Sequence, residues 1–232
     1  MFTINYILMA ELRKIINRAI DAILPAICVN CGHPIESNDL LCRACRSKII
    51  IKKSPRKIRK RFLFSATEYS DPPTRSLIKA LKYKGIISAT NPLSQLMVEY
   101  LNNSNFFKEI NSAKKYFIVP VPVHFFKKWK RGFDHSELLA KKISNETGIP
   151  TTVALRRKKW TPPQNKIKND ELRKENVKNC FALNKKSELI PKGSVLIIFD
   201  DIVTSGATIK EAAKALRPLR PSKIIFMAIA SR

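Results

Sequence analysis

The strongest pattern along the chain is a pair of continuous apolar runs near its end, at residues 195–199 and 224–230. Runs of this length are typical of strands that are buried on both faces of a parallel sheet. Between them, residues 206–219 carry apolar side chains at helical spacing. The pattern therefore predicts a strand, a helix and a second parallel strand, connected by a right-handed crossover.

The middle of the chain predicts more elements of the same kind. Short apolar or alternating runs predict strands at 62–69 and 116–122, and helical spacing predicts helices at 74–83, 92–101 and 136–147. A proline pair opens the first of these helices and Gly85 closes it. Because ligands of open α/β sheets bind where strands end, Val121 and Pro122 are candidate binding residues.

Two segments depart from this regular pattern. Residues 156–173 are basic, broken by prolines and weakly periodic, which is typical of a mobile, positively charged flap. Residues 6–24 are apolar at helical spacing but are interrupted by charges. They predict an amphipathic helix, not a signal peptide or a membrane span. Such a helix packs on the protein or, as the weaker alternative, lies on a membrane surface.

The first apolar run leads into two acids and a turn rich in hydroxyl groups: Asp200, Asp201, Thr204, Ser205, Gly206, Ala207 and Thr208. A turn of this composition between a strand and a helix points backbone N–H groups at a phosphate. The two carboxylates repel a phosphate but suit vicinal hydroxyls or a divalent cation. The segment therefore predicts a ligand with a phosphate at one end and a ribose diol at the other.

Four of the five cysteines form two C-x2-C pairs, Cys28 with Cys31 and Cys42 with Cys45. Two such pairs close a tetrahedral four-sulfur site that suits structural zinc. Disulfides are the alternative, which the reduced compartment expected for a chain without an export signal disfavours. The fifth cysteine, Cys180, is expected to be a small buried apolar residue.

Charge adds a question about partners. Lysine and arginine number 44 against 18 acidic residues, a net charge of +26. Such an excess favours polyanionic partners, nucleic acid first, although a solvated lysine-rich surface has the same composition. Aromatic residues lie within the basic runs at Trp129, Phe133 and Trp160, a combination expected for single-stranded nucleic acid.

The turn after the first apolar run resembles the phosphoribosyl pyrophosphate (PRPP) motif of type I phosphoribosyltransferases. The whole chain is similar to ComF-type proteins, the competence-associated family also called GntX-like. The matching pieces, in order, are the two cysteine pairs, Leu81-Lys82-Tyr83-Lys84-Gly85, Val119-Pro120-Val121-Pro122, Lys130-Arg131-Gly132-Phe133, Arg156 to Phe181 and the Asp200-Asp201 turn. One departure is Asp134-His135, where the family usually has Asn-Gln.

This resemblance implies an α/β fold, with a parallel sheet flanked by helices and an N-terminal zinc ribbon. It implies PRPP or a ribose phosphate as ligand, with Mg²⁺. Asp200 and Asp201 would meet the ribose hydroxyls, and residues 204–208 would wrap the 5′-phosphate. Val121 and Pro122 would border the pyrophosphate. Arg131, and Arg173 of the flap, would stabilise the leaving group together with the metal.

Three functions fit these expectations. The first is a phosphoribosyltransferase, and the second is a protein of DNA uptake that binds single-stranded DNA on the same fold. The third is an adaptor whose zinc ribbon docks a competence helicase. We expect a cytoplasmic protein with an amphipathic helix at 1–25, a ribbon at 26–50 and a phosphoribosyltransferase-like domain at 60–232.

Overall fold

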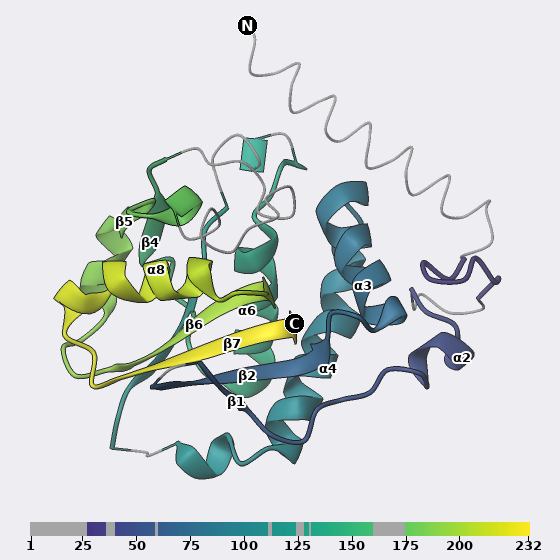
Figure 1. The fold of residues 1–232 in the computed structure, drawn as a ribbon, viewed down its shortest axis with the longest axis horizontal. Coiled ribbons are helices and arrows are strands. Elements are labelled where there is room, and N and C mark those ends of the chain that lie inside the picture. The colour runs from purple at the N-terminus through teal and green to yellow at the C-terminus, as the bar shows by residue number, and fades with distance from the viewer. Residues whose placement is uncertain are drawn as a thin grey trace, which may run out of the picture.

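The computed structural model describes residues 27–35, 40–58, 60–110, 113–123, 128–129, 131–159 and 175–232. Their centre is a five-stranded sheet (Figure 1). Its strands, in spatial order, are β1 (Arg56–Ile58), β2 (Arg61–Glu68), β7 (Lys223–Ser231), β6 (Val195–Val203) and β3 (Tyr116–Pro120). The last four are parallel, and β1 runs antiparallel along β2. The predicted parallel sheet is thus confirmed.

Helices cover both faces of this sheet. On one face, α4 (Thr90–Asn103) contacts β2 and β7, and α6 (His135–Thr147) contacts β3 and β6. On the other face, α8 (Ala207–Ala215) packs on β6 and on the hairpin of β4 (Leu155–Arg157) and β5 (Phe181–Leu183). The remaining elements are α2 (Arg43–Arg46), α3 (Pro72–Lys79), a π-helical turn (Ala80–Lys84) and 3-10 turns at Ile87–Ala89, Phe107–Glu109, Lys185–Leu189 and Arg217–Leu219.

Alternation along the buried strands divides the interior into two cores. In β6, Val195, Ile197 and Phe199 face the core under α4 and α6, whereas Leu196 and Ile198 face the core under α8. Successive strand side chains point to opposite faces, so a continuous apolar run fills both cores at once. This is the physical reason why the run predicted a strand covered on both sides.

Most predicted elements have the expected place with shifted ends. β6 is longer than predicted and carries both acids within the strand. The helix predicted to reach residue 219 stops at Ala215 and continues as a 3-10 turn, because Pro218 has no N–H to donate to the helix. The helix predicted over 74–83 changes to π-helical geometry at Ala80 and ends at Gly85, whose φ of 71° is left-handed.

Two regions were not predicted as strands. β1 lies in basic sequence just before the strand predicted at 62–69. β4 overlaps the start of the flap predicted at 156–173, and its partner β5 lies beyond the end of that flap. Leu155 and Phe181 of this hairpin are buried with Cys180 against α8. This agrees with the expectation that Cys180 is a small buried apolar residue. The rest of the flap and the N-terminal helix lie outside the described residues. In the part of the chain that is described, no helix has the length and apolar character to span a membrane.

Candidate functional site: the acid pair, the phosphate loop and the cysteine cluster

The predicted phosphate loop connects the end of β6 to the start of α8. Gly206, with φ of 72°, precedes the helix in left-handed geometry, and an added Cβ there would lie 3.4 Å from Lys210 Cε and 3.5 Å from Ile58 Cδ1. The Lys210 ammonium donates to the Ser205 carbonyl at 3.1 Å. The loop therefore sets the first N–H groups of α8 beside a lysine, which suits an anion.

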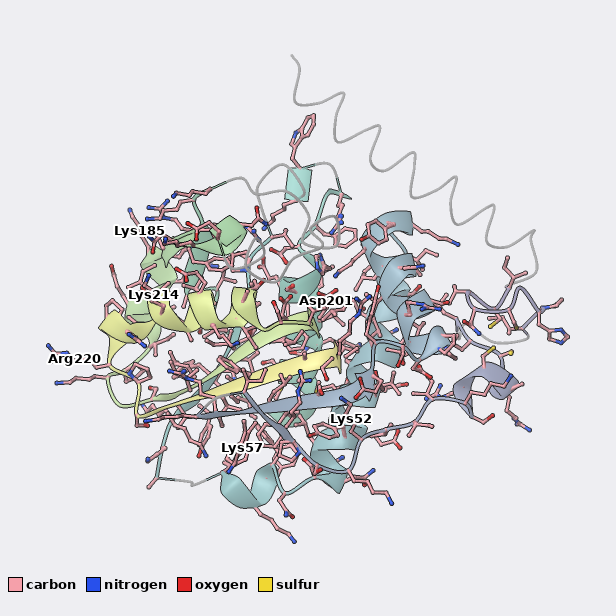
Figure 2. All side chains as sticks on the ribbon, viewed as in Figure 1. Lys52, Lys57, Lys185, Asp201, Lys214 and Arg220 are labelled. Atoms are coloured by element: carbon pink, nitrogen blue, oxygen red, sulfur yellow. The ribbon has the colours of Figure 1, made fainter. Side chains whose placement is uncertain are left out.

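Asp200 and Asp201 lie within β6 near its carboxyl end, at the same end of the sheet as the loop, where Figure 2 shows Asp201. Neighbouring strand residues point to different sides, and Asp201 turns toward α6 and the turn after α3. Its Oδ2 lies 2.5 Å from Lys82 Nζ and 3.6 Å from His135 Nε2. Asp200 Oδ1 accepts the Asp201 N–H at 3.0 Å. Three elements distant in sequence thus converge on one carboxylate.

These contacts shift the pKa values of the two acids in opposite directions. For Asp200, burial and then the charge of Asp201 raise the pKa well above its ordinary value. Burial would also raise the pKa of Asp201, but Lys82 and then His135 outweigh it and hold that pKa below its ordinary value. In the same way, burial would lower the pKa of Lys82, but Asp201 raises it. Asp201 and Lys82 therefore form a buried ion pair, whereas Asp200 favours its protonated form.

Direct coordination of a divalent cation by the two carboxyl groups does not fit this arrangement well. Such an ion prefers several ionised oxygen ligands that are open to it. One oxygen of Asp201 is already in contact with an ammonium group, and Asp200 resists ionisation. The acid pair in this structure therefore suits neutral hydroxyl groups better than Mg²⁺.

Arg131 lies on the far side of His135. One of its guanidinium nitrogens is 3.2 Å from His135 Nδ1, and the guanidinium lies 5.6 Å from the centre of the Tyr83 ring. Arginine can only donate hydrogen bonds, so Nδ1 is the acceptor and the imidazole proton of the neutral ring is on Nε2, toward Asp201. Arg131 and the acid pair are consequently linked through one buried histidine.

Val121 and Pro122 follow the end of β3 and lie beside β6 just before the acid pair, where the Val121 N–H donates to the Phe199 carbonyl at 2.8 Å. The next residue, Val123, donates its N–H to Asp134 Oδ2 at 3.0 Å. Asp134 also caps α6, because its Oδ1 accepts from the N–H groups of Ser136 and Glu137. An asparagine oxygen can make the same cap, but the second carboxylate oxygen of Asp134 also accepts from Val123, and His135 adds the contact to Asp201.

The structure therefore brings together the acids, the loop of 204–208, the strand end at 121–122 and Arg131. Arg173 lies outside the described residues. Sequence reasoning missed the roles of Lys82 and Lys210 and treated His135 only as a departure from the family pattern. Lys210 had a visible signal, because it follows Gly206 by one helical turn. Lys82 had none beyond its place in a family block, because its partner is 119 residues away along the chain.

The second candidate site is the cysteine cluster. The Sγ atoms of the four cysteines all lie within 4.8 Å of one another, and those of Cys31 and Cys42 are 3.7 Å apart. Four sulfurs at about 2.3 Å from a tetrahedral zinc ion would be about 3.8 Å apart, so the cluster fits zinc. Burial would raise the pKa of Cys28, but backbone N–H groups outweigh it and lower that pKa to about 6. For Cys45 the Asn30 hydrogen bond would lower the pKa, but burial and the three neighbouring thiols raise it to about 12, so a metal has to displace a proton there.

A polar bridge joins the cluster to the neighbouring helix. Asn30 Nδ2 donates to Cys45 Sγ at 3.2 Å, and Ser76 Oγ of α3 donates to Asn30 Oδ1 at 3.0 Å. Cys28 and Cys45 are themselves buried in the core that α4 and α6 share with the sheet. Two of the four ligands are thus part of the interior, while Cys31 is exposed, and the hydrogen bonds of Asn30 support the cluster from outside its ligands.

In a comparison with known proteins, a different family model matches the chain at each of the two candidate sites. Residues 134–232 match the phosphoribosyl transferase domain model, and residues 19–56 match the double zinc ribbon domain model. The four-sulfur cluster and the ribbon match together support a structural zinc site.

The DNA utilization protein YhgH of Escherichia coli K12 is 30% identical over 191 residues, which are 82% of this chain and 77% of that protein. Competence protein F of Haemophilus influenzae is 28% identical over 153 residues, 66% of this chain and 65% of that protein. Competence protein ComFC of Bacillus subtilis is 26% identical over 197 residues, 82% of this chain and 71% of that protein.

Among solved structures, the adenine phosphoribosyltransferase of Leishmania donovani is similar, with 12% identity and a TM-score of 0.39. The alignment covers 76% of this chain and 86% of that structure's chain. This score is below 0.5, so the domain model and the relatives carry the assignment. The chain belongs to the ComF family, with a phosphoribosyltransferase fold and a zinc ribbon.

Proposed function

We propose that the protein binds PRPP or a simpler ribose phosphate at the carboxyl end of its sheet. The observation that carries this proposal is the convergence of the acid pair with the loop before α8. The loop of 204–208 holds the 5′-phosphate through backbone N–H groups, with Lys210 nearby. Asp200 and Asp201 hold the ribose hydroxyls. Val121, Pro122 and Arg131 border the pyrophosphate.

If the site supports turnover, the bond between C1 and the pyrophosphate oxygen breaks and the acceptor attacks C1, with an oxocarbenium-like transition state. The chain then contributes by positioning the ribose and by placing positive charge near the departing pyrophosphate. Arg131 supplies that charge in the described residues, and Arg173 would add to it from the flap. Mg²⁺ bound with the pyrophosphate would neutralise part of its charge.

Calorimetric titration tests this proposal. We expect PRPP and ribose 5-phosphate to bind the intact protein, and Asp200→Asn together with Gly206→Ala to weaken binding by at least tenfold. Glu188→Gln is the control, because Glu188 is exposed and lies outside the site. If neither ligand binds the wild-type protein, with or without Mg²⁺, the proposal is wrong.

A second candidate function, single-stranded DNA binding, is favoured by a cationic groove at the other end of the sheet. The groove has a volume of about 520 Å³ and is lined by Lys60, Arg61, Phe62, Arg217, Lys223 and Ile224. It lies where β2 and β7 begin, near Arg220, whereas Asp201 lies where β6 ends (Figure 2). Cations around an aromatic ring suit the phosphates and bases of a single strand.

This candidate is tested by fluorescence anisotropy with a labelled oligonucleotide. Affinity should fall steeply with salt, and Arg61→Gln with Arg217→Gln should flatten that dependence. Trp129, which is 71% exposed, is a separate stacking candidate, while Phe133 packs partly on the core and Trp160 lies outside the described residues. Binding that is unmeasurable at low salt would remove the idea.

The names of the relatives suggest the setting of both activities. We infer a cytoplasmic role in DNA uptake or utilisation, in which the zinc ribbon is free to dock a helicase of the uptake machinery. We also propose the organisation of the chain into a helix at 1–25, a ribbon at 26–50 and a ligand-binding domain at 60–232. Pull-down of the helicase with wild-type protein, but not with a variant altered on the ribbon surface, would support the docking role.

A further inference from the structure

Lys82 is an unusual residue at the ligand site because it is a largely buried lysine that comes from a distant part of the chain. Its side chain is 17% exposed, and it lies in the π-helical turn that follows α3. Single π-helical turns are rare in proteins, and those that occur often lie at functional sites. Within the described residues, Asp201 is the ion-pair partner of the ammonium group.

The position of this ammonium matters for how the site handles charge. A ligand with a phosphate at each end brings several negative charges to a site that contains two carboxyl groups. Without a cation, the carboxylates and the ligand would repel each other. In many phosphate sites a divalent ion removes this repulsion, but here the ammonium of Lys82 lies directly on Asp201 Oδ2, 2.5 Å away.

Neighbouring groups keep this arrangement fixed. The Nε2–H of His135 points to the same Asp201 oxygen from 3.6 Å, and its Nδ1 accepts from Arg131. His135 and Asp201 are only 4% and 3% exposed, so neither can turn freely toward water. The ammonium has three donors, and one carboxylate oxygen cannot accept from all of them, so among the described residues donors remain for the oxygens of a diol beside the acid pair.

We propose that Lys82 is the built-in cation of the acid pair, occupying the place of a divalent ion between Asp201 and the ribose hydroxyls, so that ribose 5-phosphate binds without metal. This inference rests on the proposed function, since it concerns the same ligand site. It gives Lys82 the role of a ligand-binding residue and limits Mg²⁺ to the pyrophosphate of PRPP. PRPP binding should therefore respond to Mg²⁺ much more than ribose 5-phosphate binding does.

The test is calorimetric titration of the full chain with ribose 5-phosphate, in EDTA and in Mg²⁺ at matched ionic strength. We expect dissociation constants that agree within about twofold in the two buffers. Binding only in Mg²⁺ would overturn the role of Lys82 and leave the proposed function standing. Binding in neither buffer would overturn the proposed function and this inference with it.

Variants at position 82 sharpen the result. Lys82→Met should lose roughly tenfold or more in affinity in EDTA, because a charge-assisted contact is removed, and should recover part of it in Mg²⁺. Lys82→Arg should keep metal-independent binding. Lys84→Met is the matched control, since Lys84 lies in the same turn but is exposed.

A metal-specific readout complements the titration. Electron paramagnetic resonance of Mn²⁺ with ribose 5-phosphate should show free ion with the wild-type protein and bound ion with Lys82→Met. Bound Mn²⁺ with the wild-type protein would contradict the proposal, and the result does not depend on how stable the variant is.

Discussion

The cysteine cluster and the acid pair meet the same electrostatic problem in different ways. Each gathers groups that repel one another when ionised: four thiols within 4.8 Å in one case and two adjacent carboxyls in the other. The cysteines are neutralised by a zinc ion taken from outside the chain. Asp201 is neutralised by Lys82, which the chain itself supplies.

This difference affects what each region needs in order to fold. The ribbon depends on a metal for its folding free energy, and its ligands lie close together in sequence. The acid pair depends on the correct packing of α3, its π-helical turn and α6, because these elements deliver Lys82 and His135. Four changes test the comparison, and we take them in order of expected effect.

The largest effect is expected from loss of zinc. Cys45→Ser removes a ligand that is also buried in the main core, and we expect a loss of stability on the order of 5 kcal/mol with most of the bound zinc. Thermal unfolding and metal analysis measure both. His33→Ala, which changes an exposed residue beside the cluster, should change neither; equal zinc loss in this control would mean that histidine belongs to the site.

The next effect concerns the ion pair. Lys82→Met leaves Asp201 buried without its partner, and we expect a loss of about 3 kcal/mol near neutral pH. Because the folded pKa of Asp201 is lowered, the stability it provides is fully present above its unfolded pKa of about 4 and is lost as pH falls further. The difference between wild type and variant should therefore shrink in acid, as urea unfolding at several pH values would show.

A double-mutant cycle isolates this pair. Lys82→Met and Asp201→Asn should together cost clearly less than the sum of the single changes, because the second removes the charge that the first exposes. Additive losses would contradict a direct coupling between the two side chains.

A smaller effect is expected at the bridge between the two regions. Asn30→Ala removes the hydrogen bond to Cys45 and the acceptor of Ser76, and we expect a loss of about 1–2 kcal/mol with roughly tenfold weaker zinc binding. Competition with a chelator measures the affinity. Ser76→Ala is the matched variant, because it removes the link to α3 but keeps the contact to sulfur and should leave zinc affinity unchanged.

The smallest effect is expected at the departure from the family pattern. Asp134→Asn keeps an acceptor for the N–H groups at the start of α6 but turns an amide N–H toward the Val123 N–H, so we expect a loss of about 0.5–1 kcal/mol. Asp134→Ala, which removes the cap as well as the contact to Val123, should cost more in thermal unfolding, about 1 kcal/mol for the cap alone. Similar losses in both variants would show that the cap adds little beyond the contact to Val123.

The local features of this chain were predictable, and the distant ones were not. The continuous apolar run of β6, the helix that follows Gly206 and the two cysteine pairs each carry their signal within a few residues. β1 and the hairpin of β4 and β5 were missed, because three-residue strands in basic sequence have no measurable periodicity. The Lys82–Asp201 pair was also missed, because no pattern in one sequence shows which distant residues will meet.

The place of β7 in the sheet has a consequence for how the protein is made. β7 follows β2 and β6 in the sequence but lies between them in the sheet. Until a ribosome has added residues 223–231, β2 and β6 have no shared neighbour, so each leaves a strand edge unpaired. The nascent chain should thus be a target for chaperones until β7 has been made.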